Sequence, residues 1–212
     1  MLQKSLTITS LPVHATFTGK EENPASPILI DELNWLEYPY RPEVSVRLSY
    51  TTDALLITFD VTEKSVRAVE TAINGPVHND SCVEFFISFD GSHYYNFEFN
   101  CIGTPHLAYG SGRSNREKVN ASVVSTIRVN STLGQQPFGV RTGGFTWQLT
   151  SLIPLSCFVH HPSISMKGIS ATANFCKCGD ALPDPHFVTW NPINTPEPDY
   201  HRPEFFGKLL FV

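Results

Sequence analysis

Paired carboxylates are the first residues in this sequence whose types and spacing could do chemistry. Glu84 lies in the run Val83-Glu84-Phe85-Phe86, and Glu98 in the run Tyr94-Tyr95-Asn96-Phe97-Glu98-Phe99-Asn100. Both glutamates fall on the polar faces of two segments that form a predicted hairpin, so they could be neighbours. Two facing carboxyl groups can hydrolyse a glycoside. A strand glutamate is also often a solvated or ion-paired residue, so both interpretations stay open.

Aromatic rings beside directed polar groups are the second kind of chemistry in the sequence. A sugar binds with its apolar face against an aromatic ring, while carboxylate, amide or guanidinium groups bond its hydroxyls. Trp190, in a loop rich in Pro, Asn and Asp, is the predicted stacking platform, and a ring that covers the end of the fold is the alternative. Trp147 is predicted to lie in the core, and Trp35 is either a wall of the site or a packed plug.

Other catalytic and metal-binding signatures are absent from the sequence. It contains no G-x-S-x-G, H-E-x-x-H, P-loop or G-x-G-x-x-G motif. Opposite strand phases argue against a disulfide between Cys82 and Cys101, so we predict buried free thiols. Cys176-Lys177-Cys178 has no second pair at zinc-finger spacing. His160 and His161 would point to opposite faces of a strand, which does not suit one metal.

Composition narrows the classes of function further. The chain has 212 residues, a formal charge of -5 and no cluster of Lys and Arg, so nucleic acid is not an expected partner. No segment is long and apolar enough to predict a membrane span. The residues after Met1 lack an apolar core of signal-peptide length, which favours a cytoplasmic protein. Trimming at the N-terminus would instead favour a secreted or periplasmic one.

Short strands are the elements that must position these residues. Val44–Tyr50 and Leu55–Val61 alternate in polarity around a short turn, which predicts one hairpin, and 83–89 with 94–100 around Asp90-Gly91 predict a second. Further strands are expected at 122–129, 145–153, 167–176 and 205–212. The pattern predicts an all-β fold: a two-sheet antiparallel β-sandwich of jelly-roll or immunoglobulin-like type, as a single domain over 1–212. The core face should carry Val83, Phe85, Ile87, Phe89, Phe97 and Phe99.

Several segments, in one order along the chain, resemble carbohydrate-binding module family 9. They are Glu63–Ala68, Asn79–Phe86, Tyr94–Asn100, Thr189-Trp190-Asn191-Pro192 and Phe206-Gly207. More narrowly, the chain looks like a stand-alone version of the family found in gut-type Bacteroidetes. The resemblance implies a β-sandwich that binds a carbohydrate ligand without cleaving it. It also implies a place in glycan utilisation, with glycoside hydrolases of the same pathway as prospective partners.

The family's binding residues carry over only in part. In the family two tryptophans sandwich a terminal sugar; Trp190 matches the later one, whereas His78 stands at the earlier and would be a smaller, partial wall. Glu84 matches an acidic residue beside the sugar. Asn100, Asn174 and Arg113 are further candidates for contacts with hydroxyls. Some members hold calcium, although no dense run of Asp and Asn supports it here, and no other cofactor is expected.

Other classes of function stay open at this point. One is an enzyme that acts on sugars, and another is an interaction domain without a small ligand. A third is a haem or redox module, because the family's fold is similar to that of DOMON domains. Haem would need axial His or Met, and the only methionines are Met1 and Met166. For a single-sugar pocket we expect affinities on the order of micromolar to millimolar.

Overall fold

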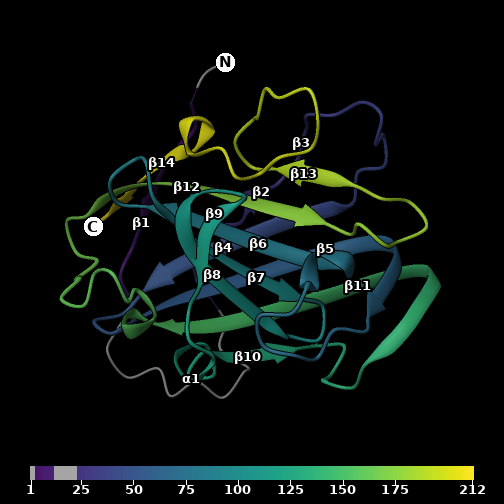
Figure 1. Ribbon diagram of the computed structural model, residues 1–212, viewed down its shortest axis with the longest axis horizontal. Coiled ribbons are helices and arrows are strands. Elements are labelled where there is room, and N and C mark those ends of the chain that lie inside the picture. The colour runs from purple at the N-terminus through teal and green to yellow at the C-terminus, as the bar shows by residue number, and fades with distance from the viewer. Residues whose placement is uncertain (1–2, 12–22) are drawn as a thin grey trace.

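Two β-sheets packed face to face form the protein in this computed structural model, which describes residues 3–11 and 23–212 (Figure 1). Among these residues the larger sheet has nine strands and the smaller has five. The larger sheet runs in the order β1 (Ser5–Ile8), β14 (Gly207–Phe211), β12 (Ser170–Cys178), β6 (Cys82–Ser88), β7 (Tyr94–Asn100), β8 (Pro105–Gly112) and β9 (Asn115–Lys118). β13 (Phe187–Thr189) pairs with β12, and β3 (Glu32–Leu33) with β13.

The smaller sheet contains the two longest strands. Its order is β10 (Arg128–Ser131), β11 (Phe138–Pro154), β5 (Ala54–Ala68), β4 (Glu43–Tyr50) and β2 (Ile28–Leu29). The described strand pairs are antiparallel except β1 with β14, which is parallel. Short helices connect the strands: η1 (Val77–Asn79), α1 (Ala121–Val124), η2 (Leu155–Cys157) and η3 (Pro203–Phe205). No helix in the described ranges is long and apolar enough to cross a membrane.

The predicted β-sandwich and both predicted hairpins are confirmed. β4 and β5 form the first hairpin, and β6 and β7 form the second. The strand predicted at 122–129 is wrong, because α1 occupies its first half and β10 begins only at Arg128. The Asn120 side chain accepts a hydrogen bond from the backbone N–H of Ser122 and so caps α1. Asn is among the best N-cap residues, and this local bond favours a helical turn over a strand.

Successive side chains along each strand of the larger sheet point alternately toward the core and toward the outer face. The predicted core residues of β6 and β7 are fully buried between the sheets, and Phe89 is partly buried against the same core. Phe85 stacks on Phe97 and on Phe175, with ring centroids 6.0 and 5.2 Å apart. Cross-strand aromatic pairs of this kind stabilise the sheet. They also hold these residues of β6 and β7 on the core face.

A second hydrophobic cluster covers the outer face of the larger sheet. Its buried members come from β6, β7, β12, η1 and the loops that follow β3 and β13: Trp35, Val77, Cys82, Phe86, Tyr94, Cys176, Cys178, Ile193, Tyr200 and Phe206. Trp35 is 2% exposed and donates its indole N–H to the Thr195 carbonyl at 3.0 Å, so it is a packed plug. The segment that follows β13, yellow in Figure 1, therefore lies over this face.

An ion pair is buried between the two sheets. Lys177 Nζ on β12 lies 2.9 Å from Glu63 Oε2 on β5, at an angle outside hydrogen-bond geometry, and 2.8 Å from His186 Nε2. Trp147, which lies in the core as predicted, donates its indole N–H to Glu63 Oε1 at 2.8 Å. Lys177 and His186 are 0% exposed and Glu63 is 2% exposed. Charges this deep need these partners, because desolvation costs several kcal/mol per ion.

His186 makes the stability of the protein depend on pH. Burial, followed by the nearby Lys177 charge, lowers the pKa of His186 to about 2. In the unfolded chain a histidine has a pKa of about 6.5, so below that pH the unfolded state binds the extra proton and stability falls as pH falls. We expect this residue to remove about 1.4 kcal/mol of unfolding free energy per pH unit between pH 6 and 5.

Urea unfolding at several pH values checks this expectation. The wild-type free energy of unfolding should fall more steeply between pH 6 and 5 than that of His186→Gln, which lacks the titrating ring. Other groups titrate equally in both proteins and cancel in the comparison. Equal pH slopes for the two proteins would show that His186 is already protonated in the folded state.

Candidate functional site

A cavity of about 240 Å³ opens on the outer face of the larger sheet. β6 and β7 form its floor, and η1, the β8–β9 turn and two loops near the C-terminal end form its rim. Most of the side chains that line it are charged or aromatic: His78, Glu84, Glu98, Arg113, Arg116, Cys178, Asp180, Phe187, Pro198, Tyr200 and His201.

Glu84 and Glu98 face this cavity from directly paired positions on β6 and β7. They are 4% and 3% exposed. Glu84 Oε2 accepts a hydrogen bond from Asn96 at 3.2 Å, and its Oε1 accepts one from the Cys178 thiol at 3.3 Å. Burial, and then the charge of Glu98, raise the pKa of Glu84 well above its ordinary value. Glu84 therefore favours the neutral acid, which can donate a hydrogen bond.

Basic side chains gather around Glu98 rather than around Glu84. Arg116 Nη1 lies 3.5 Å from a Glu98 oxygen, and His78 Nδ1 and His106 Nε2 each lie 3.9 Å away. Arg116 also donates to the Asn96 side-chain oxygen. The cavity thus presents fixed donors and acceptors in a partly dehydrated setting, where hydrogen bonds are stronger than in bulk water.

The rim of the cavity contains both an exposed side chain and a deeper one. Arg113 is 59% exposed in its side chain, contacts Asp199 at 3.4 Å and donates to the Pro198 carbonyl at 2.8 Å. His201 lies deeper: burial, and then the charges of Arg116 and Arg113, lower its pKa to about 2. The neutral His201 ring lies 3.1 Å from the Tyr94 hydroxyl through Nδ1.

Three of the six predicted binding residues meet in this cavity: His78, Glu84 and Arg113. His78 lies on η1 with 47% of its side chain exposed, and its carbonyl accepts a hydrogen bond from the Asp180 N–H at 3.1 Å. The register of the β6–β7 hairpin positions Glu84, while the tight β8–β9 turn projects Arg113. The roles of these three residues in binding stay predictions.

The prediction that Trp190 is an exposed stacking platform is wrong. Trp190 is 3% exposed and belongs to the core between the sheets, with its ring centroid 5.6 Å from that of Phe175. It follows β13, along which Val188 and Trp190 face the core while Phe187 faces outward. A side chain on Gly207 would lie 2.4 Å from the indole, so this glycine makes room for the buried ring.

Asn100 and Asn174 do not line the cavity either. Both are 0% exposed. The Asn100 amide donates to the Glu70 carbonyl and to Asp80, and its oxygen accepts from the Thr104 N–H. Asn174 is bonded in both directions to the backbone of Asn191. Since these bonds use the polar groups of both amides, neither can grip a sugar hydroxyl.

Sequence reasoning missed most of the other residues that line the cavity. Glu98 was recognised only as a partner for catalysis, although its position on the polar face of β7 already placed it beside Glu84. Arg116, Asp180, Phe187 and His201 carry no local signal, because each reaches the cavity from a loop or a short strand. Tyr200 is 6% exposed and donates its hydroxyl to the Lys177 carbonyl at 2.9 Å, which anchors the rim.

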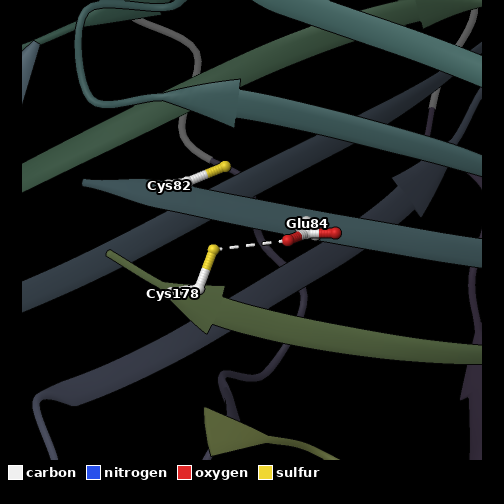
Figure 2. A group of neighbouring side chains, drawn as sticks. All are labelled: Cys82, Glu84 and Cys178. Atoms are coloured by element: carbon white, nitrogen blue, oxygen red, sulfur yellow. Dashed lines mark hydrogen bonds between the residues drawn. The ribbon is translucent and has the colours of Figure 1, made fainter. Parts of the chain in front are cut away.

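Potential metal ligands gather in one group of three among the described residues: Cys82, Glu84 and Cys178 (Figure 2). The resemblance allowed calcium, but calcium takes oxygen ligands and two of these three ligands are sulfur. All five cysteines are free and buried, as predicted. Burial raises the pKa of Cys82 to about 12, so without a metal this group is a thiol.

Comparison with known proteins decides the family. A family model described as carbohydrate-binding family 9 matches residues 20–211. The chain belongs to carbohydrate-binding family 9. A crystal structure of a candidate carbohydrate-binding protein from Bacteroides uniformis is 38% identical to this family 9 chain, with a TM-score of 0.92 and 100% of both chains covered. No curated protein matches the chain in sequence.

More distant members share the family 9 fold. A family 9 module from Caldicellulosiruptor kristjanssonii, solved with glucose, is 12% identical with a TM-score of 0.61, covering 99% of this chain and 96% of its own. The structure of a family 9 module from the same organism with cellotriose is 13% identical with a TM-score of 0.55, covering 98% and 93%. The sandwich fold is therefore shared at very low sequence identity.

Proposed function

We propose that this family 9 protein binds the end of a carbohydrate in the cavity on the outer face of its larger sheet, without cleaving it. The supporting observation is the convergence of carboxyl, guanidinium and aromatic groups in one cavity of about 240 Å³, in a chain of a carbohydrate-binding family. Pockets for drug-sized ligands occupy roughly 300–1,000 Å³, so this cavity suits a small ligand such as one sugar ring. Such a protein would act beside glycoside hydrolases of the same pathway.

Phe187 takes the role of aromatic platform that Trp190 cannot fill. It lines the cavity, and neighbouring rings hold it in place: Tyr38 at 4.8 Å and Tyr200 at 6.2 Å between centroids. A ring fixed in this way loses little conformational entropy when a sugar stacks on it. His78 would then lie on the rim as a second, smaller wall, and Glu98 with Arg113 would bond the hydroxyls.

Hydrolysis of a glycoside is the second candidate, and the paired carboxyls of Glu84 and Glu98 favour it. Hydrolysis needs one carboxyl as acid and the other as base or nucleophile on either side of the glycosidic bond. Here Glu84 is held by Asn96 and Cys178 from within the protein, while Glu98 lies 3.5 Å from the Arg116 guanidinium. We therefore expect no turnover of chromogenic glycosides. Turnover that Glu98→Gln abolishes would establish the enzyme instead.

A saccharide panel tests the proposed binding function. Calorimetric titration should begin with glucose and cellotriose, which the two Caldicellulosiruptor structures contain, and continue with xylose and other mono- and oligosaccharides. At least one should bind with a dissociation constant on the order of micromolar to millimolar. A complete lack of binding across the panel and a glycan array would leave the cavity without this function.

Two histidines of nearly equal exposure provide a matched test of the site. His78 and His93 are 47% and 49% exposed in their side chains, but His93 lies at the β6–β7 turn outside the cavity. His78→Ala should weaken the best saccharide by about threefold to tenfold, since an aromatic contact contributes about 0.5–1.5 kcal/mol. His93→Ala should leave the affinity unchanged. Equal affinities for both variants would place the sugar away from η1.

A further inference from the structure

Two cysteines and one glutamate meet on the outer face of the larger sheet, beneath the cavity. Cys178 on β12 is the direct cross-strand partner of Cys82 on β6. Glu84 follows Cys82 by two residues, so both side chains lie on the same face of β6. Figure 2 shows the Cys178 thiol directed at the Glu84 carboxylate, and one ligand atom from each of the three residues lies within 4.8 Å of the others.

These separations are close to those of ligands around one tetrahedral metal ion. Zinc binds thiolate sulfur at about 2.3 Å and carboxylate oxygen at about 2.0–2.2 Å, which places tetrahedral ligand atoms about 3.5–3.8 Å apart. The Cys178 sulfur already lies 3.3 Å from Glu84 Oε1. Small rotations of the side chains would therefore complete the geometry without movement of the strands.

The surroundings of the three residues are those of a built site. Cys82, Cys178 and Glu84 are 0%, 2% and 4% exposed. The Asn96 amide holds the second oxygen of Glu84, and hydrogen bonds of this kind orient ligands in metal sites. Cys178 and Glu84 also line the cavity, so a fourth position would be open to water or a small ligand.

The ionised form of Glu84 has no ion-pair partner among the described residues. Glu84 lies deep in the protein opposite a second carboxylate, Glu98. In the described part of the chain, the basic side chains beside these two carboxyl groups all lie next to Glu98, and Glu84 has only an amide and a thiol as hydrogen-bond partners. A divalent ion bound here would neutralise most of the negative charge that these three side chains acquire when they lose their protons.

We propose that Cys82, Cys178 and Glu84 form a binding site for one thiophilic divalent cation, best matched by Zn²⁺. The ion would replace the protons of the two thiols and of the neutral Glu84 carboxyl group, and all three protons would pass to solvent. Sulfur ligands select zinc over calcium or magnesium. This site goes beyond the proposed carbohydrate binding and does not rest on it.

Metal titration without any saccharide tests the proposal. The full chain is reduced, treated with chelator and desalted, and a thiol assay on the denatured protein confirms that all five cysteines are reduced. Zn²⁺ should bind with a stoichiometry of one by calorimetry. Co²⁺ should produce a thiolate-to-metal charge-transfer absorption, which surface histidine sites do not produce.

Single variants identify the ligands. Cys82→Ser and Cys178→Ser should each weaken Zn²⁺ binding by at least about a hundredfold and halve or abolish the charge-transfer band, and Glu84→Gln should weaken binding by at least about tenfold. Cys157→Ser removes another buried thiol outside the site and should bind as the wild type does. Circular dichroism confirms that each variant is folded, and having two cysteine variants keeps the test valid if one unfolds.

Three results would overturn the proposal: no stoichiometric binding by the reduced wild type, equal binding by wild type and both cysteine variants, or a Cys82–Cys178 disulfide that persists under reducing conditions. The saccharide titration, repeated in chelator, distinguishes failure of the metal site from failure of the proposed carbohydrate binding. Sugar binding that persists in chelator while zinc fails to bind would reject the metal site alone.

Discussion

Lys177→Met should destabilise the protein by about 3–5 kcal/mol, because it removes one partner of an ion pair buried between the sheets. The substitution leaves the Glu63 carboxylate 2% exposed, with a hydrogen bond from the Trp147 indole. Urea unfolding at pH 7 measures the loss. Lys208→Met on the neighbouring strand β14 is the control, since this lysine is exposed and surface substitutions usually change stability by less than about 0.5 kcal/mol.

A double variant separates the cost of an unpaired charge from the loss of packing. Glu63→Gln combined with Lys177→Met removes both charges, so it should be more stable than Lys177→Met alone. Apolar or neutral replacements of buried ion pairs are often close to neutral in stability. A Lys177→Met protein as stable as the wild type would show that water reaches this position and solvates the carboxylate.

Trp190→Ala should also cost about 3–5 kcal/mol of unfolding free energy, as expected for truncation of a buried tryptophan. The indole packs on Phe175 and against the backbone of Gly207, so its removal opens a void between β12, β13 and β14. Leu36→Ala removes apolar surface at a position 77% exposed and should change stability little.

Saccharide affinity gives the same variant a second readout. If the protein is held below its unfolding transition, Trp190→Ala should bind its best saccharide within about threefold of the wild type, because the indole lies outside the cavity. A variant that stays fully stable but loses binding would restore Trp190 as the stacking platform and overturn the burial described above.

Alternation of residue types alone determined the sheet face on which the two glutamates lie. In 83–89 and 94–100 the period of two leaves one arrangement that buries Phe85, Phe97 and Phe99, so Glu84 and Glu98 must share the other face. The all-β class follows from the same local signal. The alternation was easy to recognise because each strand spans several residues and its apolar residues are large.

The surroundings of the single polar residues could not be predicted in this way. Asn100 and Asn174 were plausible sugar ligands by type, yet their hydrogen bonds go to Glu70, Asp80 and Asn191, which are distant along the chain. Trp190 follows a strand of only three residues, too short for its alternation to be recognised in a proline-rich loop. Its burial depends on a glycine in β14.

Tertiary structure alone decided which residues from different segments meet. The sequence showed Cys176-Lys177-Cys178 without a matching pair, whereas the register of β12 against β6 places Cys178 opposite Cys82 and beside Glu84. Lys177, between the two cysteines, points to the opposite face, and the packing of the two sheets places it beside Glu63. Local periodicity determines the face on which a side chain lies, because backbone geometry imposes it within a strand. Neighbours across strands depend on register, which the packing of the whole sandwich determines.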